Sequence, residues 1–229
     1  MPPLRHYAQE LSRIPAIVTA ASYLVRRGPP GIDEATWDRE YAGGQWEALG
    51  KLAEMPRYAV IAGYFRSLGT ATSVLDVGCG AGQLAGWLSQ VRPLHYVGVD
   101  LSAVAIDQAR SCVPAGSRLE VADAASFDPG ETFDVIVLNE MLYYMEHPDR
   151  LLRRYGGFLA PNGAFIVSML RSTRSLRIWR ACAPALEVLG DVRLRIARTT
   201  EWQVWLCRPA AAGFSAASSV PHRTRCTPG

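Results

Sequence analysis

A short apolar run that leads into three glycines is the feature of this sequence with the clearest chemical meaning. Residues 74–77 carry one acidic side chain, Asp76, and glycines follow at positions 78, 80 and 82. A β-branched run that stops at glycines predicts a buried strand entering a tight turn. Glycine lets a ligand approach the backbone closely, and the N-terminus of a following helix attracts polar or anionic groups. We therefore expect a ligand-binding loop at Gly78 and Gly80.

Further polar residues stand where later strands are expected to end. Asp100 closes a second apolar run, Asp123 follows a third and Asn139 ends a fourth. In open α/β sheets, ligands bind outside the carboxyl ends of the strands. A carboxylate at position 100 can accept hydrogen bonds from two neighbouring ribose hydroxyls, and Asp123 could accept from an adenine amino group. The alternative is that these aspartates only cap the helices that follow them.

The glycine spacing and these strand-end residues together resemble a known family. The loop reads Gly-x-Gly-x-Gly and has Gln at position 83, so it does not match the dinucleotide-binding pattern Gly-x-Gly-x-x-Gly. With Asp76 before it, it resembles motif I of the class I S-adenosylmethionine (SAM)-dependent methyltransferases, and the resemblance extends over about residues 72–170. It implies that SAM is the cofactor. It also implies a set of cofactor-binding residues: Asp76, Gly78 and Gly80 near the methionine part, Asp100 at the ribose, Leu101, Asp123 and Ala124 at the adenine, and Asn139 at the sulfonium side.

An aromatic segment before the glycine loop is the candidate lid. Residues 37–46 read Trp-Asp-Arg-Glu-Tyr-Ala-Gly-Gly-Gln-Trp, and Arg57 follows. In small-molecule enzymes of this class the equivalent stretch folds over the cofactor. The resemblance thus implies that Tyr41 and Trp46 exclude water and that Arg57 pairs with the methionine carboxylate. Alternatively, Trp37 and Trp46 are packing anchors and Arg57 lies on the surface.

Candidate catalytic residues lie directly after Asn139. The segment 140–147 resembles the corresponding loop of nodulation protein S-like N-methyltransferases. A base is needed only if the nucleophile must lose a proton, and His147 is then the candidate, because its pKa lies near neutrality. Glu140, Tyr143 or Tyr144 could instead orient an amine or hydroxyl, with His147 structural at the start of a helix. The sequence shows no metal-ligand constellation.

Alternating strand and helix patterns supply the frame for these residues. They predict an α/β fold with a doubly wound, mostly parallel seven-stranded sheet and N-terminal helices. The expected strands are residues 74–77, 95–99, 119–122, 133–138, 164–169, 192–197 and 202–208. The expected helices are residues 83–91, 103–112 and 148–158, with one or two more within 172–189, and a turn falls at 161–163.

The N-terminal part is expected to be helical. We predict helices over residues 1–27, from about Glu34 with Asp33 as its cap, and over 49–68, where Pro56 could interrupt the helix. The domain prediction is a helical cap or lid at 1–70, a SAM-binding domain at 71–209 and a disordered tail at 210–229.

Composition bounds the class of protein. The chain has 229 residues and a net charge of +3, which does not call for a nucleic-acid partner, although its C-terminal third is basic. Five cysteines without a Cys-x-x-Cys pair fit neither a disulfide framework nor a zinc site, so we expect cytoplasmic thiols. The apolar run 14–25 is too short to span a bilayer. We read it as a packed helix, with membrane-surface association as the alternative.

The sequence thus predicts a SAM-dependent methyltransferase that acts on an N or O nucleophile of a small molecule, in specialised metabolism. The expected partner is a small-molecule substrate, without nucleic acid or integral membrane association, and a homodimer is left open. The alternatives are an RNA or protein methyltransferase and a non-catalytic protein that binds SAM or its product S-adenosylhomocysteine (SAH). The arginine series at positions 171, 174, 177 and 180 is either a solvated helix face or a site for an acidic substrate.

Overall fold

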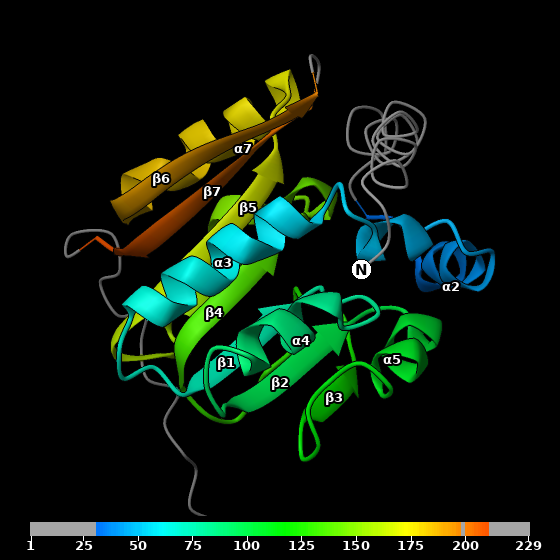
Figure 1. Ribbon diagram of the computed structural model, residues 1–229. Coiled ribbons are helices and arrows are strands. Elements are labelled where there is room, and N and C mark those ends of the chain that lie inside the picture. Colours follow the sequence, from blue (N-terminus) through cyan, green and yellow to red (C-terminus); the bar gives the residue numbers. More distant parts are fainter. Residues whose placement is uncertain (1–30, 198–199, 211–229) are drawn as a thin grey trace, which may run out of the picture.

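A seven-stranded sheet forms the centre of the protein in the computed structural model, which describes residues 31–197 and 200–210 (Figure 1). The strand order is β3-β2-β1-β4-β5-β7-β6. The first five strands in this order pair in parallel, and β7 pairs antiparallel with both β5 and β6. The strands are β1 (Ser73–Val77), β2 (His95–Asp100), β3 (Arg118–Val121), β4 (Phe133–Asn139), β5 (Leu159–Leu170), β6 (Leu186–Ala197) and β7 (Thr200–Pro209). The predicted mostly parallel, seven-stranded α/β fold is confirmed.

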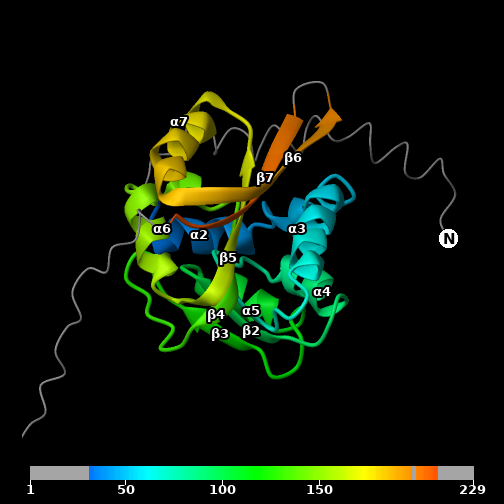
Figure 2. The ribbon, with the colours of Figure 1, turned by 90° about the vertical axis from the view of Figure 1, so that its left-hand side faces the viewer.

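Helices cover both faces of this sheet, as Figure 2 shows from the side. The α-helices are α2 (Glu34–Ala42), α3 (Met55–Ser67), α4 (Gln83–Ser89), α5 (Ala103–Ala109), α6 (Pro148–Gly156) and α7 (Thr173–Cys182). Short 3-10 helices are η1 (Glu47–Gly50), η2 (Leu142–Tyr144) and η3 (Ala183–Ala185). Successive residues of β1 point to opposite faces of the sheet. Val74 packs with the core beneath α3 and α4, whereas Leu75 packs with the core beneath α6 and α7.

Two of the predicted helices differ from the structure at the ends where proline stands. The helix expected over 49–68 is wrong in its first part, because α3 starts at Met55 and Pro56 lies in its first turn. Proline has no N–H to lose there, so it starts a helix rather than interrupting one. Of the helical stretch expected over 172–189, α7 ends at Cys182, and Pro184 lies in η3.

The last strands are longer than expected. β6 begins at Leu186, not at position 192, because Leu186–Val188 pair with the end of β7.

The turn expected at 161–163 is instead an irregularity inside β5. Asn162 takes a left-handed φ of 67°, and the register against β4 shifts between the pairs Phe133–Leu159 and Val135–Ala164.

The N-terminal predictions are tested only in part. Asp33 caps α2 as expected and accepts a hydrogen bond from the Thr36 backbone N–H at 2.7 Å. The helix predicted over 1–27 and the tail beyond residue 210 lie outside the described residues. Within the described part of the chain, no helix combines the length and the apolar character needed to cross a bilayer.

Candidate active site

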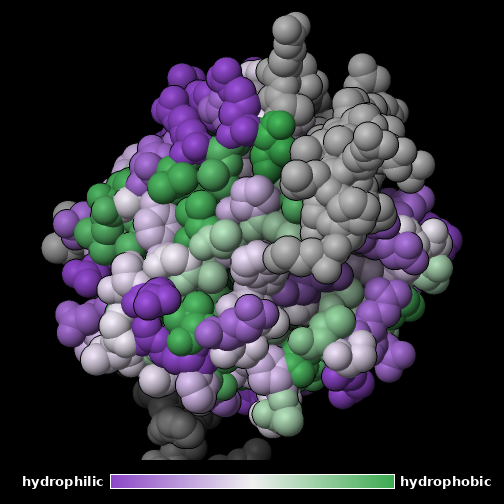
Figure 3. Space-filling view, viewed as in Figure 1, coloured by the Kyte–Doolittle hydropathy of each residue, from purple (hydrophilic) through white to green (hydrophobic). Residues whose placement is uncertain are grey.

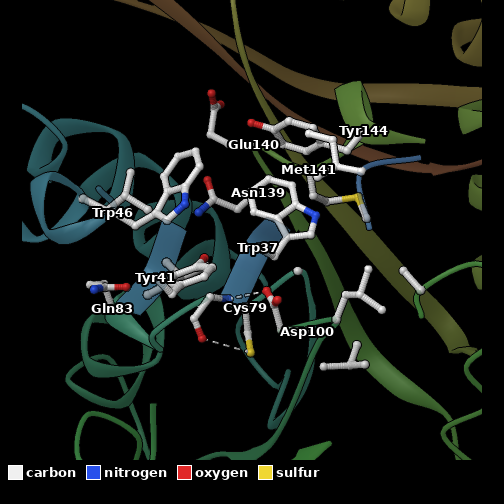
Figure 4. Close-up of a pocket in the computed structure, with 18 of the residues that line it drawn as sticks. Trp37, Tyr41, Trp46, Cys79, Gln83, Asp100, Asn139, Glu140, Met141 and Tyr144 are labelled. Atoms are coloured by element: carbon white, nitrogen blue, oxygen red, sulfur yellow. Dashed lines mark hydrogen bonds between the residues drawn. The ribbon is translucent and has the colours of Figure 1, made fainter. Parts of the chain in front are cut away.

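A cavity of about 370 Å³ lies at the carboxyl ends of β1, β2 and β4 (Figure 4). This volume falls within the range of roughly 300–1,000 Å³ that is usual for small-molecule sites. Residues from α2, α3 and β7 also line it, so segments far apart in the sequence meet here. Its lining includes Trp37, Tyr41, Trp46, Glu54, Arg57, Gly78, Cys79, Gly80, Asp100, Leu101, Asp123, Ala124, Asn139, Glu140, Met141, Tyr144 and Trp202.

The glycine loop forms one wall with its backbone. Gly78 and Gly80 take left-handed φ values of 73° and 54°. A β-carbon at position 78 would come within 2.9 Å of the Met141 Cβ, and one at position 80 within 2.7 Å of the Tyr41 hydroxyl. Only glycine satisfies both the backbone conformation and the space, so the loop offers its backbone directly to a ligand.

Asp100 ends β2 and faces this loop. Its carboxylate accepts hydrogen bonds from the backbone N–H of Gly80 at 2.9 Å and of Ser102 at 3.0 Å. Burial raises the pKa of this carboxyl above its usual range. Leu101 lines the same part of the cavity, so the predicted ribose and adenine contacts stand side by side.

Asp123 and Ala124 lie at the predicted adenine end. Both line the cavity. Asp123 also accepts a hydrogen bond from the Ala125 N–H at 2.9 Å, so its carboxylate serves the local turn as the alternative interpretation expects. One role does not exclude the other, because a carboxylate has several acceptor positions.

Asp76 lies behind the loop and does not line the cavity. It is buried in β1, where its Oδ2 accepts a hydrogen bond from the Tyr96 hydroxyl at 2.7 Å. Its Oδ1 has no hydrogen-bond partner among the described residues. Burial raises the pKa of the Asp76 carboxyl to about 7. Any effect of Asp76 on a ligand in the cavity would therefore act through the loop.

Aromatic side chains from α2 and the following turn form the outer wall. Figure 4 shows Trp37, Tyr41 and Trp46 together on one side of the pocket. The Trp37 ring lies 5.6 Å from Trp46 and 4.8 Å, edge to face, from Tyr144. α2 is held against α5 by the Asp38 carboxylate, which accepts from the Ser102 hydroxyl at 2.6 Å. These rings are thus both packing anchors and cavity lining.

Arg57 lies in the interior and not on the surface, since only 1% of it is exposed. Its Nη2 donates to Glu54 Oε2 at 2.6 Å, its Nη1 donates to Asn139 Oδ1, and its Nε has no partner among the described residues. The guanidinium lies 5.8 Å from the Trp202 ring. Glu54 and Trp202 also line the cavity and were not predicted from the sequence. The three-residue spacing between Glu54 and Arg57 was a weak signal for Glu54, whereas no pattern in the sequence indicated Trp202.

Glu140 is the predicted catalytic residue that the fold brings to the cavity. It has a left-handed φ of 60°. Its carboxylate accepts from the Ser168 hydroxyl at 2.8 Å, from the Tyr143 hydroxyl at 2.8 Å and from the Leu170 N–H at 3.0 Å. Tyr143 itself is fully buried outside the lining, where it positions Glu140.

His147 lies apart from this group. It precedes α6 as an exposed residue whose side chain makes no capping hydrogen bond, and it does not line the cavity. The geometry supports its alternative reading as a residue at a helix start. Its role as a base stays a prediction.

The arginine series at positions 171, 174, 177 and 180, whose last three members lie on α7, is partly engaged in structure. Arg171 pairs with Glu201 at 2.8 Å, and Arg174 donates to the backbone oxygen of Tyr143. Glu201 also pairs with Arg195 at 3.1 Å. Hydrophilic residues gather at the top of the face seen in Figure 3, where the β6–β7 end of the sheet lies in Figure 1.

The residues present fit the expected SAM. Gly78 and Gly80 line the cavity with their backbone, and Asp100 places a carboxylate beside Gly80. The unpartnered Nε of buried Arg57 is a donor suited to a carboxylate. Within the described part of the chain, no three His, Cys, Asp or Glu side chains are grouped so that they could hold a metal ion.

Comparison with known proteins identifies the family. Residues 44–210 match a family model described as a methyltransferase domain. Trans-aconitate 2-methyltransferase of Paracidovorax citrulli is 33% identical over 140 residues, which cover 56% of this chain and 54% of that protein. The chain spans about half the length of the curated relatives it matches.

Solved structures show the same fold. N-methyltransferase NodS from Bradyrhizobium japonicum, in complex with SAH, superposes with a TM-score of 0.68 at 20% identity, covering 77% of this chain and 97% of that one. A 1,6-didemethyltoxoflavin-N1-methyltransferase from Burkholderia thailandensis, also with SAH, gives 0.62 at 18% identity, covering 77% and 86%. With a family model that matches most of its length, a glycine cradle and the shared fold, the chain belongs to the class I SAM-dependent methyltransferases.

Proposed function

We propose that the protein transfers the methyl group of SAM to an N or O nucleophile of a small molecule, in specialised metabolism. The observation that carries this proposal is one cavity in which the glycine loop and Asp100 share a space with a second wall of Trp37, Glu140 and Tyr144. A cofactor along the first wall leaves the second wall for the acceptor.

The residues of the chain would position and shield the reactants. When bound, SAM supplies an electrophilic methyl carbon that a nucleophile attacks in line with the carbon–sulfur bond. Asp100 would accept from the ribose hydroxyls, Arg57 would donate from Nε to the methionine carboxylate, and Asn139 would stand at the sulfonium side. Tyr41 and Trp46 would exclude water, which strengthens these polar contacts.

Relatives and chain organisation give further support. The names of two of the relatives above refer to small acceptors, trans-aconitate and 1,6-didemethyltoxoflavin. The proposal includes residues 1–70 as a cap or lid, 71–209 as the SAM-binding domain and 210–229 as a tail. A cytoplasmic location belongs to it as well, and a homodimer is left open. Methylation of RNA or protein has the basic C-terminal third in its favour, but Arg171 there pairs with Glu201.

Transfer of labelled methyl groups tests the proposal. The protein is incubated with methyl-labelled SAM and, separately, with small-molecule extract, RNA or protein. Label in the small-molecule fraction is expected. Asp100→Ala should reduce it, whereas Asp107→Ala, an exposed change on α5, should not. Label only in RNA or protein would overturn the proposal, and SAH binding without any transfer would indicate a non-catalytic partner protein.

A further inference from the structure

The cavity wall carries an excess of negative charge. Among the described residues, the charged side chains that line it are the carboxylates of Glu54, Asp100, Asp123 and Glu140 and the guanidinium of Arg57. Asp100 and Asp123 stand at the predicted ribose and adenine end. Glu54 and Glu140 stand at the other end, where the Arg57 guanidinium is the one cation of the described lining. The charge of Arg174, which does not line the cavity, opposes the upward shift in the pKa of the Tyr144 hydroxyl.

Glu54 has an acceptor atom free for a ligand. Only 5% of the residue is exposed, and its Oε2 accepts from Arg57 at 2.6 Å. Its Oε1 has no hydrogen-bond partner among the described residues, although the side chain lines the cavity. Burial raises the pKa of this carboxyl, and the charge of Glu140 raises it further. A buried acceptor beside a second carboxylate is costly unless a donor meets it.

Glu140 is held in place and also keeps acceptor capacity. Three donors, from Ser168, Tyr143 and Leu170, fix its carboxylate, whereas a carboxylate has about four acceptor positions. Figure 4 shows Glu140 and the Tyr144 ring on the same side of the pocket. The Tyr144 hydroxyl has no partner among the described residues, and the Glu140 charge raises the pKa of that hydroxyl in addition to burial.

The aromatic lining at this end also favours a cation. Trp37 meets Tyr144 edge to face at 4.8 Å. The guanidinium of Arg57 already lies 4.9 Å from the Tyr58 ring centre and 5.8 Å from that of Trp202. The faces of such rings attract cations, most strongly where water is excluded. By contrast, an acceptor with several carboxylates would face Glu54 and Glu140, and Arg57 is the one cation among the described residues that line the cavity.

We propose that the acceptor is an amine whose ammonium form binds between Glu54 and Glu140, beside Tyr144. This inference rests on the proposed function and names its substrate class. Before transfer the ammonium loses a proton to the Glu140 carboxylate. The nitrogen lone pair then forms the bond to the methyl carbon as the carbon–sulfur bond breaks, with that electron pair left on sulfur, and the net reaction releases one proton.

Binding of three matched probes to the protein–SAH complex tests the inference. 2-Phenylethylamine, 2-phenylethanol and 3-phenylpropionate share an aromatic skeleton and differ in charge. Calorimetry should show that the amine binds at least ten-fold more tightly than the other two. The inference is overturned if the acid binds as tightly as the amine, or if the three probes cannot be distinguished.

Charge-neutral variants locate the ammonium site. Glu140→Gln can keep all three hydrogen bonds, since its amide oxygen can accept from Tyr143 and Leu170 while its NH₂ donates to Ser168 Oγ. We expect Glu140→Gln and Glu54→Gln to reduce amine affinity to that of the alcohol and to leave SAH affinity unchanged. Glu187→Gln, on the exposed part of β6, is the control and should change neither.

Two outcomes separate this inference from the proposed function. If Glu140→Gln and Glu54→Gln weaken SAH binding and spare the amine, these carboxylates bind the cofactor's own ammonium. The amine inference is then wrong, although the methyltransferase proposal stands. If the wild-type protein does not bind SAH, both proposals are overturned.

Discussion

The carboxylate of Asp100 accepts a hydrogen bond from the backbone N–H of Gly80 at 2.9 Å. The two residues meet because β1 and β2 pair in parallel up to Val77 and Val99, so the loop after β1 passes the end of β2. The side chain predicted to accept from the ribose therefore also holds the glycine loop.

Replacing Asp100 by Ala should weaken SAH binding. The change removes an acceptor to the ribose, and hydrogen bonds to charged groups contribute roughly 1.5–3 kcal/mol. Calorimetric titration with SAH measures the effect, and Asp107→Ala should bind SAH as the wild type does. An unaltered dissociation constant for Asp100→Ala would mean that the carboxylate serves only the loop and the start of α5.

Replacing Gly80 by Ala should damage the site more than its backbone conformation alone explains. Gly69, at the end of α3, has a similar φ of 56° but nothing within 4 Å of an added β-carbon. Both alanine variants should lose about 1–2 kcal/mol of stability from the left-handed conformation. Only Gly80→Ala places a β-carbon 2.7 Å from the Tyr41 hydroxyl, so only that variant should also lose SAH affinity.

A second substitution checks the cause of that loss. Tyr41→Phe removes the hydroxyl that a β-carbon at position 80 would meet, and it should restore part of the SAH affinity of Gly80→Ala. Equal SAH affinities for the Gly80→Ala and Gly69→Ala variants would contradict the predicted clash.

Residues 33–57 should gain protection from hydrogen exchange when SAH binds. Trp37, Tyr41 and Trp46 line the cavity, so a ligand adds contacts to this segment and lowers the population of its open forms. The strand β6, at the edge of the sheet and outside the cavity lining, supplies the internal comparison and should change little. Identical exchange of residues 33–57 with and without SAH would show that they form a permanent wall and not a lid.

The contribution of Asp76 to the free energy of unfolding should fall as the pH rises from about 4 to about 7. Burial raises the pKa of its carboxyl in the folded state to about 7 from an ordinary 3.8. The folded state therefore holds this proton over a pH range in which the unfolded chain has released it, so the stabilisation is complete below the unfolded pKa and is lost as the pH passes through the folded one. Nearby Asp100 adds to the upward shift, whereas Arg57 opposes it.

Denaturant unfolding of Asp76→Asn at several pH values measures this contribution. The free energy of unfolding of the wild type, relative to the variant, should fall between pH 4 and 7. Asp134→Asn should behave differently, because the hydrogen bonds from Thr72 and Ser73 hold the pKa of Asp134 below its usual 3.8 despite some burial. The contribution of Asp134 is lost only as the pH falls below that value, so the corresponding difference should change little between pH 4 and 7. Parallel curves for wild type and Asp76→Asn would contradict the predicted titration.

Local patterns in the sequence were sufficient for the central strands and for the position of Gly78, Gly80 and Asp100 at the strand ends that line the cavity. The run 74–77 and the glycines after it predicted β1 and its loop, and Asp100 was placed at a strand end where parallel strands put ligands. Such predictions succeed because β-branched runs, glycine and helix caps act within a few residues of chain, as at Asp33 and Thr36. The helix bounds predicted around Pro56 and Pro184 were partly wrong, since the effect of a proline depends on where in a helix it stands.

The tertiary structure alone decided which distant side chains meet. Arg57 and Asn139 are 82 positions apart and become hydrogen-bonded only because α3 packs near the end of β4. Trp202 reaches the cavity because β7 inserts antiparallel between β5 and β6. Glu140, and not His147, faces the cavity because Ser168 and Leu170 of β5 bind its carboxylate. Periodicity along the chain indicates which face of an element is buried, but the partner of that face depends on packing between elements. This packing brings Arg57, Asn139, Glu140 and Trp202 to one cavity.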